Sequence, residues 1–515
     1  MSTNVSKSAV IDIGSNSIKL LLGEKTGETL NIIELLKNGV AIGLDVFYKG
    51  RISKEITNQT INILNKYKNK LSEYGMENPH VIATTAVREA SNKEIFINTI
   101  YRKTCIQIEA LTPGDIVYYI VAYLYNKLKD KYPIHEKNLL IVELGSGSLD
   151  VSVLQKGFIS ANMDLPIGTL RLKQMSGKFE GSFEEIYEVW SDYLKNEISN
   201  IKRSVPHIQI DDIIVIDENY SAYFDNILSK KVKDEFFSIS REDSGALLGA
   251  LKEHNAEYIS GKYKIPFEFS DTMGAFGHIL ESFFSVFGTE KVYMFQALLS
   301  EAVLANKLLD YELSSKYNKT NQLASAAKFF CEKYRADMPH INMVVELSEQ
   351  LFGALREELG LKRSDGIYLM LAAYMHDLGM FVHNRSHHKH TEYLINSFDL
   401  FRLSEEERAI VACVARYHRK AIPSNNHLLY KTLSTDKQIL VQKLSSILRI
   451  SNALDSSHMQ KIKRVEIGIS KKKEVVITAF SDQNVIIEKN DFNEKKYLFE
   501  EITGSSIKLK VSSGA

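Results

Sequence analysis

The chain has 515 residues, and its 64 lysines and arginines balance its 64 aspartates and glutamates. This length exceeds what one hydrophobic core supports, so we expect several domains, and the even charge gives no support to a nucleic-acid partner. The three cysteines are widely spaced, which is typical of a reducing compartment. Without an apolar run long enough for a signal peptide or a bilayer crossing, we expect a cytoplasmic protein that does not enter a membrane.

The chain begins with a strand–turn–strand pattern. The apolar residues 9–11 predict a buried strand that ends at Asp12, and residues 18–22 predict a second strand. The small polar turn between them consists of Gly14, Ser15, Asn16 and Ser17. Its backbone N–H groups and hydroxyls can surround an oxyanion such as phosphate, and Asp12 can hold a cation beside it. Taken alone, the pattern fits an ordinary β-hairpin equally well.

The same pattern returns about 130 residues later. Residues 139–142 predict a strand that leads into Glu143, and a second strand follows at residues 151–154, directly after Asp150. The turn between the strands consists of Gly145, Ser146, Gly147 and Ser148. A device used twice indicates a duplicated architecture. Two such turns that face each other across a cleft would bind the phosphates of one ligand.

Strands and helices alternate through the rest of the first 310 residues, which predicts α/β layers. The predicted helices are 53–74 with Ser53 as N-cap, 93–101, 116–129, 183–201, 244–254 and 290–311. The predicted strands are 30–36, 80–83, 106–111 and 213–216, and the glycines at 39, 43 and 50 predict a loop. Arg88 follows the strand at 80–83, where its guanidinium can meet a phosphate; the alternative is a surface arginine in an ion pair.

A polar stretch at residues 314–321 predicts a linker to a second region. From there to His458 the pattern is almost wholly helical and rich in histidine. After His458, residues 465–469 and 475–479 predict strands, with the lysines at 471–473 as a hairpin tip in solvent.

Together these motifs resemble the exopolyphosphatase / guanosine pentaphosphate phosphohydrolase (Ppx/GppA) family. The stretches that carry the resemblance are residues 11–17, 83–92, 143–148, 165–172, 387–390 and 415–420. The resemblance implies two actin-like (ribonuclease-H-like) lobes at 1–128 and 129–312. It further implies an HD-type helical domain at 320–458 and a small β-rich C-terminal domain at 462–515.

The resemblance also implies a chemistry. Water attacks the terminal phosphoryl group of polyphosphate or guanosine pentaphosphate in the cleft between the lobes, with Mg²⁺, or Mn²⁺ in its place. Residues 14–17, Arg88 and residues 145–148 would bind phosphate. Asp12, Glu143 and Asp150 would surround the metal, and Asp115 and Glu143 would be the catalytic residues. A homodimer is implied by the resemblance alone.

The sequence departs from the family pattern at four places in the first region. Two of them are residues 143–150, where the acids Glu143 and Asp150 are swapped in length and Ser146 replaces a Gly, and residues 300–302, where Ser-Glu-Ala replaces Arg-Glu-Gly. Asp115 stands where the family has a catalytic Glu, and a carboxylate retracted by about 1 Å can lower the rate on the order of 100-fold. Residues 217–220 replace a Gly/Thr-rich loop at the nucleotide end of the cleft. These departures favour an alternative in which the chain senses a phosphorylated ligand without turning it over.

The histidine-rich region resembles HD phosphohydrolases. The proposed ligands of a second divalent metal are His340, His376, Asp377 and His418, with His387 and His388 in the same ordered set. Asn452 stands where such enzymes commonly carry Asp, with Asp455 three residues on, so metal affinity is expected to fall. Two alternatives stay open: a structural domain with hydrogen-bonded histidines, and hydrolysis confined to this domain.

Overall fold

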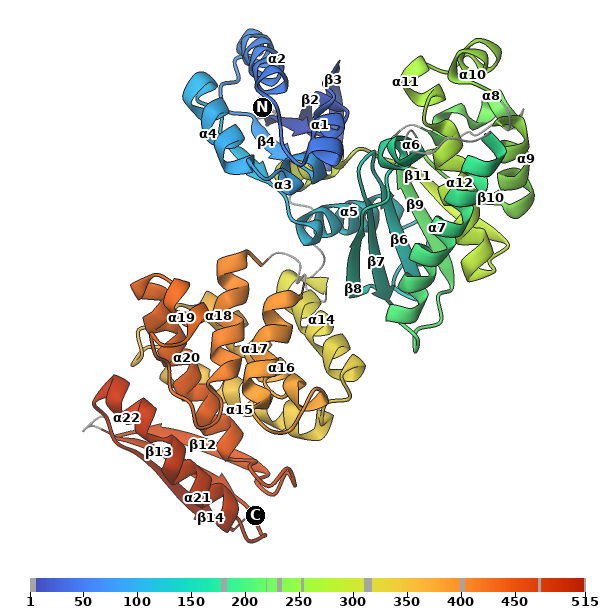
Figure 1. Cartoon of the computed structure of the whole chain (residues 1–515). Helices are drawn as coiled ribbons and strands as arrows, with labels where there is room; N and C mark the ends of the chain where they lie inside the picture. The colour runs from blue at the N-terminus through green and yellow to red at the C-terminus, as the bar shows by residue number, and fades with distance from the viewer. Residues whose placement is uncertain are drawn as a thin grey trace. The chain divides into compact units, whose positions relative to one another are not determined.

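The computed structural model describes residues 6–176, 183–218, 220–228, 234–251, 254–309, 317–398, 403–470 and 474–513. The chain forms two compact units, Met1–Asn318 and Lys319–Ala515 (Figure 1). No helix among the described residues combines the length and the apolar character that a bilayer crossing needs.

The first sheet of the Met1–Asn318 unit has five strands in the order β3-β2-β1-β4-β5. The strands are β1 (Lys7–Ile13), β2 (Ser17–Thr26), β3 (Thr29–Gly39), β4 (His80–Ala83) and β5 (Ile108–Ala110). β1, β2 and β3 are antiparallel, whereas β4 and β5 run parallel to β1. The accompanying helices are α1 (Ile42–Lys49), α2 (Lys54–Glu73), α3 (Thr85–Glu89) and α4 (Lys93–Thr104).

The second sheet repeats this arrangement in the order β10-β11-β9-β6-β7-β8. Its strands are β6 (Asn138–Leu144), β7 (Leu149–Gln155), β8 (Phe158–Leu165), β9 (Asp212–Asp217), β10 (Phe236–Ser240) and β11 (Lys291–Gln296). β6, β7 and β8 are antiparallel, β9 and β11 run parallel to β6, and β10 is added antiparallel at the edge. The duplication predicted from the two turns is therefore a duplication of a whole sheet.

Helices also surround the second sheet. They are α6 (Thr169–Ser176), α7 (Phe183–Ser204), α8 (Phe224–Leu228), α9 (Arg241–Leu251), α10 (Ala256–Tyr263), α11 (Phe267–Ser270) and α12 (Met273–Phe287), with a 3₁₀ turn η1 (Ser221–Tyr223). α7 and α9 pack on α12, whose apolar side chains are largely buried.

Two further helices each follow one sheet in the sequence but pack against the other sheet. α5 (Pro113–Leu128) follows the first sheet in sequence but packs against β7 and β8 of the second. α13 (Leu299–Leu309) follows the second sheet but packs against β1 and β2 of the first, and the two helices contact each other. Gly23 in β2 permits the close approach, since a Cβ there would lie 2.9 Å from Cδ2 of Leu304.

The Lys319–Ala515 unit is helical with a small sheet at its end. Its helices are α14 (Lys319–Lys333), α15 (Met338–Leu355), α16 (Gly366–Met375), α17 (His387–Ser397), α18 (Glu405–Arg416), α19 (Leu428–Thr432), α20 (Thr435–Ala453), α21 (Ile486–Lys495) and α22 (Tyr497–Thr503), with 3₁₀ turns η3 (Arg363–Asp365) and η4 (Leu378–Phe381). β12 (Arg464–Ile469), β13 (Val475–Phe480) and β14 (Ile507–Ser512) form the sheet, and α20 packs against α21 and α22.

Most elements expected from the sequence are confirmed. Ser53 caps α2 by accepting a hydrogen bond from the backbone N–H of Ile56, and β4 spans residues 80–83 as predicted. The strands expected at 465–469 and 475–479 are β12 and β13. The lysines at 471–473 and residues 314–316 of the predicted linker lie outside the described residues, and residues 319–321 of that linker belong to α14.

Two expected elements are wrong. The glycine-punctuated loop contains helix α1, because Gly43 is needed there for close packing and not to break the chain. A Cβ on Gly43 would lie 2.8 Å from the ring of Phe47 and 3.0 Å from Cβ of Ser15. The helix expected from residue 290 begins only at Leu299, and residues 291–296 form β11, whose apolar side chains pack beside β9.

Candidate functional sites

The two Gly/Ser turns have the same local structure. The backbone N–H of Gly14 donates to the carbonyl of Ser17, and the N–H of Gly145 donates to the carbonyl of Ser148, each at 3.0 Å. Each turn joins two antiparallel strands, β1 to β2 and β6 to β7. Both motifs are therefore β-hairpins, and their turns are the Gly/Ser turns that the sequence predicted.

Within the Met1–Asn318 unit the two turns lie against each other. The hydroxyls of Thr85, at the start of α3, and Ser148 are 2.7 Å apart. A Cβ on Gly147 would lie 2.5 Å from the ring of Phe47 and 2.8 Å from the hydroxyl of Ser15, so only glycine fits there. A cavity of about 40 Å³ remains beside the turns, lined among others by residues 14–17 and Ser146.

Acidic side chains gather below these turns. Asp12 and Glu143 are the next-to-last residues of β1 and β6, and their direct strand partners are Lys19 and Asp150. The Lys19 ammonium lies 3.8 Å from Asp12 and forms an ion pair with Glu218. The structure thus places the three predicted metal-binding acids in one cluster, which also contains Lys19 and Glu218.

The electrostatics of this acidic cluster favour a bound cation. Burial raises the pKa of Asp12 to about 6, against the opposing effect of Lys19. Burial, and then repulsion from Asp150, Glu218 and Asp12, raises the pKa of Glu143 well above its ordinary value. Oδ1 of Asp12 is buried without a hydrogen-bond partner among the described residues. Clustered carboxylate oxygens with an unsatisfied atom are donors that suit Mg²⁺.

Two other predicted site residues already have protein partners. Asp115 belongs to a capping box at the start of α5: its Oδ2 accepts hydrogen bonds from the N–H (3.1 Å) and hydroxyl (2.7 Å) of Thr112. Arg88 forms a 2.7 Å ion pair with Asp164 and donates to the carbonyl of Leu111. Catalysis by Asp115 and phosphate binding by Arg88 stay predictions.

The sequence reasoning missed Lys19 and the role of Glu218. Lys19 interrupts the apolar run of β2 and is buried. A lysine inside a buried strand is rare unless it is paired, and this was the signal available in the sequence. Glu218 carries no such signal, because it reaches the cluster only through the pairing of β9 with β6.

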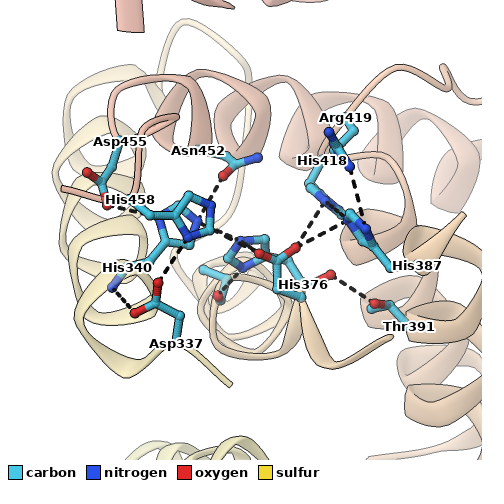
Figure 2. A network of polar contacts seen from close by, with 12 residues as sticks. Asp337, His340, His376, His387, Thr391, His418, Arg419, Asn452, Asp455 and His458 are labelled. Atoms are coloured by element: carbon cyan, nitrogen blue, oxygen red, sulfur yellow. Dashed lines mark hydrogen bonds and ion pairs between the residues drawn. The ribbon is translucent and has the colours of Figure 1, made fainter. Parts of the chain in front are cut away.

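The histidine cluster lies in the Lys319–Ala515 unit (Figure 2). His340 comes from α15, His376 and Asp377 follow α16, and His418 follows α18. Nε2 of His340 and Nε2 of His376 are 3.3 Å apart, and Oδ1 of Asp377 lies 3.4 Å from Nε2 of His418. The predicted ligands are therefore brought together, and His387 of the same ordered set, at the start of α17, lies 3.4 Å from the same Asp377 oxygen.

The histidine side chains of this cluster are buried. Burial lowers the pKa of His376 to about 4 and that of His418 well below its ordinary value. Asn452 Oδ1 lies 3.1 Å from Nε2 of His340, whereas Asp455 contacts the other ring nitrogen, Nδ1, at 2.9 Å. Asp455 therefore supports His340 from behind and does not replace the carboxylate that Asn452 lacks.

Comparisons with known proteins agree with these features. The Ppx/GppA phosphatase family model matches residues 20–310, and the model of Ppx/GppA phosphatase, domain III, matches residues 324–499. A guanosine-5'-triphosphate,3'-diphosphate pyrophosphatase from Pseudoalteromonas translucida is 22% identical over 472 residues, 86% of each chain.

Solved structures agree in fold with the first part of the chain. An exopolyphosphatase from Cytophaga hutchinsonii has a TM-score of 0.52 at 19% identity over 59% of this chain and 98% of its own. The Ppx/GppA family member from Aquifex aeolicus has a TM-score of 0.51 at 22% identity over 60% of this chain and 100% of its own. With a family model that matches more than half of its residues, the chain belongs to the Ppx/GppA phosphatase family.

Proposed function

We propose that the chain is a metal-dependent phosphohydrolase that releases terminal phosphate from inorganic polyphosphate or guanosine pentaphosphate at its paired turns. Support comes from family membership and from two relatives, one named as a guanosine-5'-triphosphate,3'-diphosphate pyrophosphatase and the other as an exopolyphosphatase. The observation that carries the proposal is the pairing of two Gly/Ser turns with the same backbone hydrogen bond, each preceded by a strand that brings an acid to one buried cluster.

In this proposal different residues of the chain bind phosphate, hold the metal and accept the proton. The N–H groups and hydroxyls of residues 14–17 and 145–148 bind the phosphate oxygens. Asp12, Glu143 and Asp150 would hold Mg²⁺, which when bound supplies positive charge to the phosphate and activates water. Asp115, which stands where the family has its catalytic Glu, would accept the proton of the attacking water. A P–O bond to water forms as the bridging P–O bond breaks.

Substrate entry requires two local changes in this proposal. The cavity of about 40 Å³ is too small for a phosphate chain, so the turns at Ser15 and Gly147 must separate. Arg88 must exchange the carboxylate of Asp164, which it contacts through Nη2 alone, for a phosphate, whose oxygens suit the planar guanidinium.

The test is phosphate release by the full chain from long-chain polyphosphate and from guanosine pentaphosphate, with Mg²⁺, with Mn²⁺ and with chelator. We expect metal-dependent release that Glu143→Gln lowers at least about 100-fold. Glu24→Gln, on the same strand as Lys19 but away from the cluster, is the control and keeps the wild-type rate. Wild-type release by Glu143→Gln contradicts the assignment. Thermal stabilisation by a substrate without turnover would make the cleft a sensor.

A further inference from the structure

A cavity in the Met1–Asn318 unit lies outside the paired turns. It measures about 340 Å³, and the described residues that line it come from α7, α9 and α12. α7 and α9 both pack on α12, and the lining includes Gly274 and His278, which are one helical turn apart on α12 (Figure 1). A concave site of about 300–1,000 Å³ is typical of small-molecule pockets. The cavity is therefore large enough for a small organic ligand.

The α9 side of the cavity is apolar and leaves space unfilled. Leu248, Gly249 and Leu251 line this side. A Cβ on Gly249 would meet no described atom within 4 Å, so no packing contact in the described structure requires glycine there. Glycine in a helix interior is less stable than alanine, because the unfolded chain has more freedom to lose. The glycine thus keeps the cavity open without improving the packing of α9.

Three aromatic rings meet on the opposite side of the cavity. The ring centroids of Tyr187 and His278, which both line it, are 4.7 Å apart. The ring of Trp190 lies behind them, 5.4 Å from Tyr187 and 5.8 Å from His278. Burial lowers the pKa of His278 to about 4, so this ring is neutral near pH 7 and adds no positive charge to the cavity. The aromatic wall therefore offers uncharged π-faces.

The charged residues of the described lining are both acidic. Glu184 and Glu188 are one helical turn apart on α7, with Tyr187 between them in the sequence. The lining contains no lysine or arginine among the described residues. Aromatic faces attract a cation that lies within about 6 Å of the ring centroid, and carboxylates attract it further. The cavity thus selects a cation with an apolar body and disfavours anions, including the phosphate compounds that suit the paired turns.

Helix α12 also connects the cavity to the second Gly/Ser turn. Its N-cap residue is Thr272, whose hydroxyl lies 2.8 Å from the hydroxyl of Tyr220. The Tyr220 hydroxyl lies 2.8 Å from that of Thr169, and all three side chains are buried. The N–H groups of residues 169–170 donate to the carbonyls of residues 145–146, at 3.4 and 3.0 Å. A shift of α12 therefore reaches the turn through a short chain of hydrogen bonds.

We propose that this cavity is a regulatory site for a small amine with an apolar body, and that α12 transmits its occupancy to the second turn. The ammonium group lies at Glu188 and the face of Tyr187, and the apolar body fills the space beside Gly249 and His278. A ligand that binds one arrangement of α12 more tightly shifts the molecule toward that arrangement. The effect on phosphate release rests on the proposed function, whereas binding of the amine does not.

Tryptophan fluorescence of the full chain measures binding, because Trp190 is the only tryptophan in the sequence. The compound titrated is 2-phenylethylamine, with 2-phenylethanol as its neutral analogue and 3-phenylpropionate as an anionic one, and calorimetry gives a second measure. We expect saturable binding of the amine, at least about 10-fold weaker binding of the alcohol, and none of the anion. No saturable signal and no heat with the amine would overturn the proposal, and equal affinity for amine and alcohol would refute selection for a cation.

Two pairs of variants locate the site. Gly249→Leu fills the cavity and should weaken amine binding at least about 10-fold, whereas Gly245→Leu, one turn earlier on α9 and outside the described lining, should leave it unchanged. Glu188→Gln should weaken binding of the amine but not of the alcohol, and Asp192→Asn, also on α7, is its control. Circular dichroism confirms that each variant folds. Wild-type affinity for the amine in Gly249→Leu would show that it binds elsewhere and would overturn the proposal.

Amide hydrogen exchange at residues 145–148 tests the regulatory part without turnover. We expect saturating 2-phenylethylamine to slow exchange there and to change the rate of phosphate release. Thr272→Val removes the hydroxyl that contacts Tyr220, so it should bind the amine normally but lose both effects. Unchanged exchange at residues 145–148 in the amine-bound wild type would refute regulation through α12. Slowed exchange in a chain that releases no phosphate would contradict the proposed function and support this inference.

Discussion

Lys19 and Asp150 occupy equivalent positions in the two sheets, because each is the direct strand partner of the acid that precedes a Gly/Ser turn. Asp12 therefore faces a cation, whereas Glu143 faces a second carboxylate. Burial, and then repulsion from Asp150, raises the pKa of Glu143 well above its ordinary value. The duplicated framework has thus produced one pair of opposite charges and one pair of two carboxylates.

Replacing Lys19 tests this balance. Lys19→Met leaves Asp12 and Glu218 without their buried cation, and losing one partner of a buried pair lowers the free energy of unfolding by about 3–5 kcal/mol. We expect a lower melting temperature in chelator and a larger stabilisation by Mg²⁺ than in the wild type. The control is Lys37→Met, whose partly exposed 3.0 Å pair with Glu268 is worth less than about 1 kcal/mol. Equal melting temperatures for the two variants would contradict this role.

Asp217 gives the Met1–Asn318 unit a defined pH dependence. Burial raises its pKa from 3.8 to about 6, although its carboxylate accepts a hydrogen bond from the N–H of Ser221. Between these two pH values the folded state binds more protons than the unfolded state, so the free energy of unfolding falls as the pH rises. Asp217→Asn removes this effect and should be more stable by on the order of 2–3 kcal/mol above pH 6 and equal below pH 4.

Thermal unfolding of wild type and Asp217→Asn across this pH range is the measurement. Asp211→Asn, at the exposed position just before β9, serves as the control and should follow the wild-type curve. A constant offset between wild type and Asp217→Asn at all pH values would show that burial of the ionised carboxylate is not the cause.

Variants of Asp115 and Thr112 distinguish a catalytic role of Asp115 from its role in the capping box of α5. Thr112→Ala removes the side chain that accepts the N–H of Asp115, and loss of such a cap lowers stability by about 1 kcal/mol. Its phosphate release should stay near the wild-type rate. Asp115→Asn keeps an oxygen to accept hydrogen bonds but removes the basic carboxylate, so we expect an unchanged melting temperature and a rate at least about 100-fold lower. If Asp115→Asn retains full activity, the only role of Asp115 is in the capping box of α5.

Gly147 tests the contact between the turns. Gly147→Ala places a methyl group 2.5 Å from the ring of Phe47 and 2.8 Å from the hydroxyl of Ser15, which forces the turns apart. Displacements of about 1 Å can reduce rates on the order of 100-fold, so phosphate release should fall. Adding Phe47→Leu relieves the clash and should recover part of the rate. Gly245→Ala, which meets nothing within 4 Å, is the control. A double variant no better than Gly147→Ala would contradict the steric explanation.

Local chemistry made much of the site predictable from the sequence. The two turns have Gly and Ser at matching positions after an acid, and apolar strands on either side fix their geometry; Asp12, Glu143 and Asp150 follow from the same pattern. The histidines were grouped because their order along the chain resembles the ligand set of HD phosphohydrolases. In both cases short-range pattern and position within an element were sufficient.

Long-range packing decided what the sequence did not reveal. Glu218 joins the acids only because β9 pairs with β6, and His387 reaches Asp377 only because α17 packs beside η4. The sequence pattern predicts a helix over residues 291–296, but pairing with β9 makes them a strand. Gly43 resembles a loop residue until the neighbouring side chains of Ser15 and Phe47 are known. Each error concerns a residue whose partners are distant in the chain.

The exchange of α5 and α13 has a consequence during protein synthesis. β1 and β2 leave the ribosome long before the helix that covers them, because α13, with Leu304 against Gly23, is made nearly 300 residues later. At about 5–20 residues per second, the first sheet waits on the order of tens of seconds with an apolar face unprotected. The nascent chain should therefore depend on chaperones until α13 emerges, and truncation before Leu299 should yield an aggregation-prone protein.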